Sequence, residues 1–257
     1  FKQGNRNIIA EPVFGCFAGM LYSLLTLKTK DDILVIASPE RAYGLYLEIQ
    51  SLLEVFGCSD KPLYYPEDDS LIYSMLKPSD GLSAERAVVY RQLVSEKRKI
   101  VIAGMNTLAE KIPGPDIIKE NFFKAAAGSH LDAEKLMSCL VSNGYERTAR
   151  VEQVFEFSSR GSIIDVFTPD HDYPVRIELS GDTVESLRFF STDTNTSNKK
   201  IDKISLMLFS PRLKHTRPGS SIDAFFDTKK TTVILDDFDA LKKEAYGRMD
   251  KISRYSG

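Results

Sequence analysis

Three short runs of aliphatic residues constrain the fold of this 257-residue chain more than any other feature. A continuous apolar run of this kind is typical of a strand that is buried on both faces of a parallel sheet. The first two runs lie near each other, whereas the third lies far beyond them in the sequence. The pattern therefore predicts an α/β fold whose parallel sheet is completed by a distant segment. The runs are Ile33–Ala37, Ile100–Ala103 and Thr231–Leu235.

Helical patterns separate these strands. After the first run, Ser38 occupies an N-cap position and Pro39 the first helical position, and an apolar stripe follows until Gly57 ends the helix. A short strand at 63–65 and a second helix at 84–96 lead to the second run. This β-α-β-α-β order predicts right-handed crossovers that cover the sheet with helices.

The chain changes character after Pro113-Gly114-Pro115. Val175, Ile177 and Leu179 alternate with polar residues, which indicates a sheet with one solvated face. We expect an antiparallel meander here, with one helix before it, so that residues 119–206 form a β-rich α+β domain inserted into a discontinuous α/β domain of residues 1–118 and 207–257. The expected elements are a helix at 133–142, strands at 151–157, 163–167, 175–179, 184–190 and 204–209, and a helix at 238–253.

Composition excludes several classes of protein. The chain carries 34 Lys and Arg against 36 Asp and Glu, a net charge of −2, which argues against a dedicated polyanion binder. The three cysteines are far apart and form no C-x-x-C pair, so we expect free thiols in a reducing, cytoplasmic compartment. The histidines share no ligand spacing with them, and no metal site is expected.

The most apolar stretch, Pro12–Leu27, is shorter than the roughly 20 residues that span a bilayer. We expect it to form a buried helix of a soluble core instead. Because the chain begins with Phe1 and not with Met, we also expect it to be part of a longer protein.

A phosphate-binding loop needs G-x-x-x-x-G-K-[ST], and the nearest match is GCFAGML. If Gly19 stands for the second glycine, Met20 occupies the position of the lysine and Leu21 that of the hydroxyl residue, so both the charge and the metal contact are missing. Gly15, Gly19 and Met20 therefore mark at most a degenerate P-loop, and we expect a glycine-spaced core helix. Asp236-Asp237 follows a buried strand like a metal-holding pair, but without a P-loop we interpret it as a helix N-terminus. No nucleophile motif and no acidic pair with the spacing of a glycosidase occur, so no catalytic residue is predicted.

Two arginines, Arg160 and Arg176, fall on what we expect to be neighbouring strands of the one-sided sheet. Their guanidinium groups could bind carboxylates of a partner protein, or they could simply be solvated. These residues alone leave both possibilities open.

Three consecutive motifs extend this observation: RGSIIDVF at Arg160–Phe167, YPVRIE at Tyr173–Glu178 and GDTVESLR at Gly181–Arg188. Together they resemble the UvrA-binding domain 2 shared by the excision-repair protein UvrB and the transcription-repair coupling factors (Mfd). The lead-in NGY at Asn143–Tyr145, followed by VEQV at Val151–Val154, is more similar to the coupling factors.

Two departures favour the coupling factors over UvrB. The P-loop is degenerate, and the segment 64–82 is shorter than the DNA-inserting hairpin of UvrB, although it keeps Tyr64, Tyr65 and Tyr73. The resemblance implies a RecA-like domain 1a (1–118), a UvrA-binding domain 2 (119–206) and a domain 1b (207–257), without a cofactor in this segment. ATP and Mg²⁺ would serve motor domains elsewhere in the family.

The resemblance also implies site residues. The family's two UvrA-contacting arginines fall on Arg160 and Arg176, and Ser180 stands where the coupling factors have a phenylalanine. Leu179 could compensate for that loss, and Glu178 is a candidate for the rim of the contact.

The leading hypothesis is therefore a non-catalytic module that recruits UvrA to stalled RNA polymerase. In the family, the full-length protein is an ATP-driven translocase on double-stranded DNA, and a later domain masks the UvrA-binding face. One alternative is a fragment of a UvrB-like ATP-dependent helicase that processes damaged DNA. Another is an α/β scaffold whose middle sheet binds an unrelated protein.

Overall fold

The computed structural model describes residues 15–67, 80–95, 97–194, 196–210 and 219–255. The chain divides into two compact units, each built from separated segments. The first comprises Phe1–Glu67, Arg98–Ala109 and Phe226–Gly257. The second comprises Asp68–Lys97 and Glu110–Phe225.

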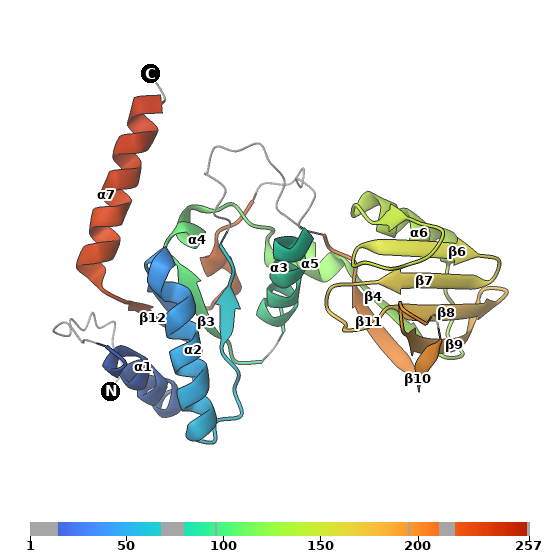
Figure 1. The fold of residues 1–257 in the computed structure, drawn as a ribbon, viewed down its shortest axis with the longest axis horizontal. Helices are drawn as coiled ribbons and strands as arrows, with labels where there is room; N and C mark the ends of the chain where they lie inside the picture. Colours follow the sequence, from blue (N-terminus) through green and yellow to red (C-terminus); the bar gives the residue numbers. More distant parts are fainter. Residues whose placement is uncertain (1–14, 68–79, 96, 195, 211–218, 256–257) are drawn as a thin grey trace. The chain divides into compact units, whose positions relative to one another are not determined.

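The first unit holds a four-stranded parallel sheet (Figure 1). Its strand order is β12-β1-β3-β2, so the distant third run pairs directly with the first, with Leu34 opposite Val233. The predicted parallel sheet and its completion by a distant segment are confirmed. The strands are β1 (Asp32–Ala37), β2 (Leu63–Tyr65), β3 (Ile100–Gly104) and β12 (Thr231–Leu235).

Helix α2 (Pro39–Val55) covers one face of this sheet. It begins after Ser38 as predicted, although the Ser38 side chain makes no capping hydrogen bond. Leu45, Ile49 and Leu53 lie fully buried against β1 and β3, because their spacing places them on one face of the helix. The unit also contains α1 (Phe17–Lys28), α4 (Asn106–Ala109) and α7 (Phe238–Tyr255).

Helix α1 departs from its prediction as a buried helix. It packs on α2 through small residues, and its large side chains remain exposed, with Phe17 66% and Met20 43% accessible. Close packing between two helices favours small residues at the contact, which directs the larger ones outward. Among the described helices, none combines the length and hydropathy that crossing a bilayer requires.

The second unit is dominated by an antiparallel sheet in the order β10-β9-β8-β7-β6-β5, in which only β5 runs parallel to its neighbour β6 (Figure 1). The predicted meander is confirmed. The strands are β5 (Glu146–Arg147), β6 (Glu156–Arg160), β7 (Ile163–Phe167), β8 (Val175–Ser180), β9 (Thr183–Phe190) and β10 (Ser197–Ile201).

One face of this sheet carries the core of the unit. Helix α6 (Ala133–Ser142) and the strand pair β4 (Phe122–Ala126) and β11 (Lys203–Met207) pack against it. Asp132 caps α6 by accepting a hydrogen bond from the Lys135 N–H at 2.9 Å. The opposite face of the sheet has no such layer among the described elements and carries the polar residues of each strand.

The expected strand at 151–157 was wrong in position. Residues 151–155 lead into the sheet, and β6 begins only at Glu156 and ends at Arg160. Phe155 is fully buried and has φ +67°, a left-handed conformation that interrupts an extended strand. Because β7 lies between β6 and β8, Arg160 and Arg176 are not on neighbouring strands as expected.

Helix α3 (Asp80–Leu93) belongs to the second unit, whereas the expected domain boundaries include these residues in the first domain. Arg86 forms two hydrogen bonds to Glu110, at 2.5 and 3.0 Å, and Arg91 pairs with buried Asp170. Tyr90 packs edge-on against Phe209. The remaining helices of this unit are α5 (Pro115–Glu120) and a short 3-10 turn, η1 (Ile222–Phe225).

Candidate functional site

The outer face of the six-stranded sheet carries ordered rows of polar side chains. Antiparallel pairing places Ser158, Asp165, Arg176 and Arg188 directly opposite one another on four successive strands, and Lys200 continues the row on β10. A second row holds two of the other predicted site residues, Arg160 and Glu178. It consists of Arg160, Ile163, Glu178 and Ser186.

Arg176 is held rigidly at the centre of the first row. Its Nε and Nη2 donate to the two oxygens of Asp165, each at 2.8 Å, and its guanidinium lies 4.6 Å from the centre of the Phe190 ring. These hydrogen bonds with Asp165 raise the pKa of Arg176 above its usual range. Two hydrogen bonds to one carboxylate fix the orientation of the planar guanidinium group of Arg176.

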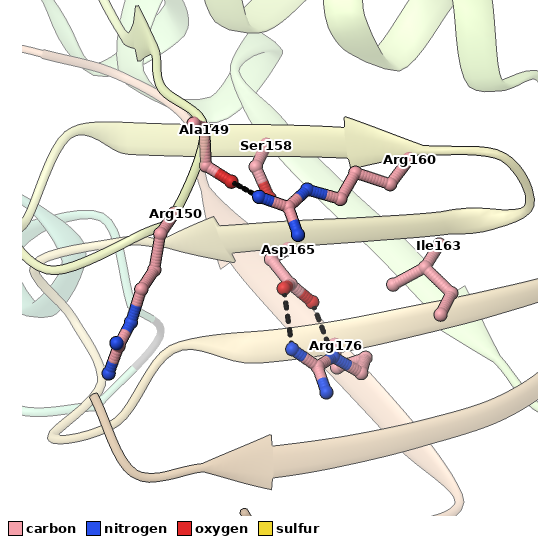
Figure 2. Close-up of a pocket in the computed structure, with 7 residues that line it drawn as sticks. All are labelled: Ala149, Arg150, Ser158, Arg160, Ile163, Asp165 and Arg176. Atoms are coloured by element: carbon pink, nitrogen blue, oxygen red, sulfur yellow. Dashed lines mark hydrogen bonds and ion pairs between the residues drawn. The ribbon is translucent and has the colours of Figure 1, made fainter. Parts of the chain in front are cut away.

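Arg160 is the last residue of β6, beside the tight turn at Gly161. Its side chain points back along the outer face and donates to the backbone oxygen of Ala149 (Figure 2). Arg150 extends from the adjoining loop and donates to the backbone oxygens of Thr192 and Asp193.

A cavity of about 240 Å³ lies among these side chains. Figure 2 shows both predicted arginines at its border, so the structure brings Arg160 and Arg176 together across β7. The sequence prediction missed Arg150, because a residue in a loop before the strand carries no periodic signal of the face it reaches. It also missed Ile163, although this residue is the first of β7 and lies within the quoted RGSIIDVF motif. The cavity is lined by Ala149, Arg150, Ser158, Arg160, Ile163, Asp165 and Arg176.

The other predicted residues do not line this cavity. Glu178 accepts a hydrogen bond from Ser186 at 2.9 Å and pairs with Arg188. Ser180 is exposed at the end of β8. Leu179 is 7% accessible and lies in the core on the opposite face, so its side chain does not compensate for the missing phenylalanine.

The expected P-loop residues lie in the first unit, at the start of α1. Gly15 has φ +65° and precedes the helix, and Gly19 lies within it. A Cβ atom on Gly19 would come within 2.9 Å of the Cβ of Glu48, so this glycine permits a close approach of α1 to α2. Met20 is exposed.

Asp236 and Asp237 have different roles, whereas the sequence suggested one role for both. Asp237 accepts a hydrogen bond from the Ala240 N–H and begins α7, as predicted. Asp236 is buried and accepts hydrogen bonds from Tyr22 at 2.8 Å and from Arg41 at 2.6 Å. Burial and the Asp236 hydrogen bond raise the pKa of Tyr22 well above its usual range, which keeps the phenol protonated.

The tyrosines kept in the short segment 64–82 are not grouped together on the described surface. Tyr65 is fully buried, and Tyr64 packs edge-on against Tyr43 of α2 with ring centres 5.1 Å apart. Tyr73 lies outside the described residues. Within the described part of the chain, the three cysteines are free thiols, and no group of His, Cys, Asp or Glu side chains has the arrangement of a metal site.

Comparison with known families gives a match over the segment that contains this sheet. Residues 123–209 match the family model of the UvrB interaction domain. This segment is therefore similar to the UvrB interaction domain. It contains all five residues predicted to bind a partner, together with Ile163 and Arg150.

Curated relatives extend this similarity beyond the UvrB interaction domain. A transcription-repair-coupling factor of Rickettsia bellii is 30% identical over 183 residues, which cover 71% of this chain and 16% of that protein. The corresponding protein of Bacillus subtilis is 31% identical over 205 residues, covering 79% of this chain and 17% of that protein. The chain therefore spans about one sixth of the length of these relatives. The predicted resemblance to coupling factors is confirmed.

Proposed function

We propose that the UvrB interaction domain of this chain binds UvrA through the outer face of its sheet. The observation that carries this proposal is the convergence of Arg160 and Arg176 on one cavity, on the sheet face opposite the layer of described elements that forms the core. Both residues fall on the arginines that the family resemblance implies for UvrA contact. Because Asp165 already orients the guanidinium group of Arg176, this group loses little further conformational freedom on binding. Its hydrogen bonds to a partner therefore contribute more to the binding free energy.

In this proposal the chain is the recruitment segment of a transcription-repair-coupling factor, which brings UvrA to stalled RNA polymerase. RNA polymerase, double-stranded DNA and ATP-driven movement then belong to parts of the coupling factors that this chain does not match. The similarity to one sixth of those proteins supports this assignment.

The test is calorimetric titration of UvrA into the wild-type chain and the double variant Arg160→Ala with Arg176→Ala. We expect the double variant to lose about 2–4 kcal/mol of binding free energy, because charged anchors dominate such interfaces. Lys135→Ala is the matched control, since Lys135 is an exposed cation on α6, which covers the other face of the sheet. Equal affinity in the double variant and the control would refute the site, and no binding by the wild type would refute the function.

We further propose that the first unit is a degenerate, RecA-like P-loop domain that does not hydrolyse ATP. Met20 stands at the position of the phosphate-binding lysine. Asp236, at the carboxyl end of β12, is already engaged in an ion pair with Arg41. The alternative, a UvrB-like helicase fragment, requires nucleotide binding. A saturable rise of the melting temperature with ATP and Mg²⁺ would favour that alternative over our proposal.

A further inference from the structure

The cavity on the UvrB interaction domain has an unbalanced charge. Three guanidinium groups, those of Arg150, Arg160 and Arg176, border it, and Asp165 is the one carboxylate among its lining residues. Glu152 lies 3.7 Å from Arg150, but its side chain is 64% exposed and screened by water. Among the lining residues alone, three guanidinium groups stand against one carboxylate, a surplus of two formal positive charges, while Glu152 and Glu178 act on Arg150 and Arg176 from outside the lining.

The guanidinium groups are positioned before any ligand arrives. Asp165 orients Arg176, the backbone oxygen of Ala149 orients Arg160, and the Asp193 oxygen, at 3.2 Å, orients Arg150. Each of these acceptors comes from a different part of the unit. Because a neutral backbone oxygen does not cancel a full positive charge, Arg150 and Arg160 keep their attraction for an anion.

The lining also has an apolar component. Ile163 is partly buried and lies directly opposite Arg160 in the row, on the same face as Glu178. It is the one large apolar side chain among the residues that line the cavity, whereas Phe190 contacts Arg176 without lining it and Leu179 points into the core. An apolar side chain beside guanidinium groups suits an acidic side chain as the ligand, because Asp and Glu have both methylene and carboxylate groups.

We propose that this cavity receives acidic side chains of the docked protein, with Arg150 as a third arginine anchor and Ile163 as the apolar wall. The inference rests on the proposed function, because it concerns the same face and the same partner. Nucleic-acid phosphates would satisfy the charge but not the apolar wall, and the chain as a whole carries a net charge of −2.

The experiment measures UvrA affinity and its salt dependence for variants of the two new residues. Arg150→Gln removes the charge but keeps a donor for the Thr192 and Asp193 oxygens, and we expect about tenfold weaker binding and a shallower dependence of affinity on salt. Arg150→Lys keeps the charge and should keep the wild-type salt dependence. Ile163→Ala should weaken binding about threefold to tenfold without changing the salt dependence.

Matched controls come from α6, on the other side of the sheet. Lys135→Gln removes an exposed cation, and Val141→Ala trims an exposed aliphatic side chain, so neither should change affinity. Circular dichroism and melting temperature of every variant verify that the unit remains folded.

The outcomes separate this inference from the proposed function. If Arg160→Ala and Arg176→Ala weaken UvrA binding while Arg150→Gln and Ile163→Ala match their controls, the inference is overturned and the proposed function stands. If the wild type binds no UvrA, both are overturned. If a duplex DNA oligonucleotide binds the wild type and Arg150→Gln abolishes that binding, the cavity is a phosphate site and the acidic-side-chain proposal is wrong.

Discussion

At the scale of single residues, the molecule uses arginine–carboxylate pairs for two purposes. The pair between Asp165 and Arg176 lies on the outer face, where it orients the guanidinium group of an arginine whose side chain remains 20% accessible. The pair between Asp170 and Arg91 is structural, because the Asp170 side chain is only 1% accessible. The carboxylate side chains differ in burial, with Asp165 11% and Asp170 1% accessible, whereas both arginines remain partly accessible.

Asp170 leads to a prediction about pH. Burial acts to raise its pKa, but hydrogen bonds with His171 and Thr168 and the charge of Arg91 outweigh burial and lower it below the usual value. A lowered pKa in the folded state stabilises the fold above the unfolded value of about 3.9, and this stability is lost as the pH falls through the folded pKa. We expect Asp170→Asn to cost about 2–4 kcal/mol at pH 7 and progressively less below about pH 4.

Urea unfolding of both proteins from pH 7 to pH 3 measures this difference. The neighbouring exposed residue provides the control, Asp172→Asn, which should change little at any pH. A cost for Asp170→Asn that stays constant across the range would contradict the prediction.

At the scale of elements, the contact between α1 and α2 depends on the absence of a side chain at Gly19. The buried face of α1 is made of small residues, Ala18, Gly19, Ser23 and Thr26. Gly44, on α2, is the counterpart without a packing role, because nothing lies within 4 Å of the position of its missing Cβ. The two helical glycines thus test packing against intrinsic helix propensity.

We expect Gly19→Ala to destabilise the first unit by about 1–3 kcal/mol, because the new methyl group forces the Glu48 side chain and the helices apart. Gly44→Ala should instead stabilise it by about 0.5–1 kcal/mol, since alanine restricts the unfolded chain and favours the helix. Chemical denaturation monitored by circular dichroism gives both values. A loss of similar size in both variants would show that close packing at Gly19 is not the cause.

At the scale of the whole molecule, the two units have separate hydrophobic cores. Leu45 belongs to the core under α2, and Leu136 of α6 belongs to the core under the antiparallel sheet. Both leucines are fully buried. Each core is closed by segments from distant parts of the chain, so each unit completes its packing without residues of the other core.

We expect Leu45→Ala and Leu136→Ala each to cost about 2–5 kcal/mol in its own unit. Scanning calorimetry should then show that each variant lowers the melting temperature of one transition and leaves the other in place. One shared transition that shifts equally in both variants would contradict this independence.

The sequence by itself determined the elements that local patterns encode. Aliphatic runs identified the parallel strands, alternation along β8 identified the solvated face, and consecutive motifs identified Arg160 and Arg176 as candidates for binding. These signals are local, because burial of a strand or of one sheet face leaves its period in the sequence.

Only the tertiary structure decided how residues from different elements meet. In the structure, β6 spans Glu156–Arg160 and α3 belongs to the second unit. Arg150 and Ile163 line the cavity together with the predicted arginines. The structure also showed that Leu179 belongs to the core and that Asp236 is held by Tyr22 and Arg41. Such contacts join residues far apart in the chain, and hydrogen bonds between them leave no periodic trace in the sequence.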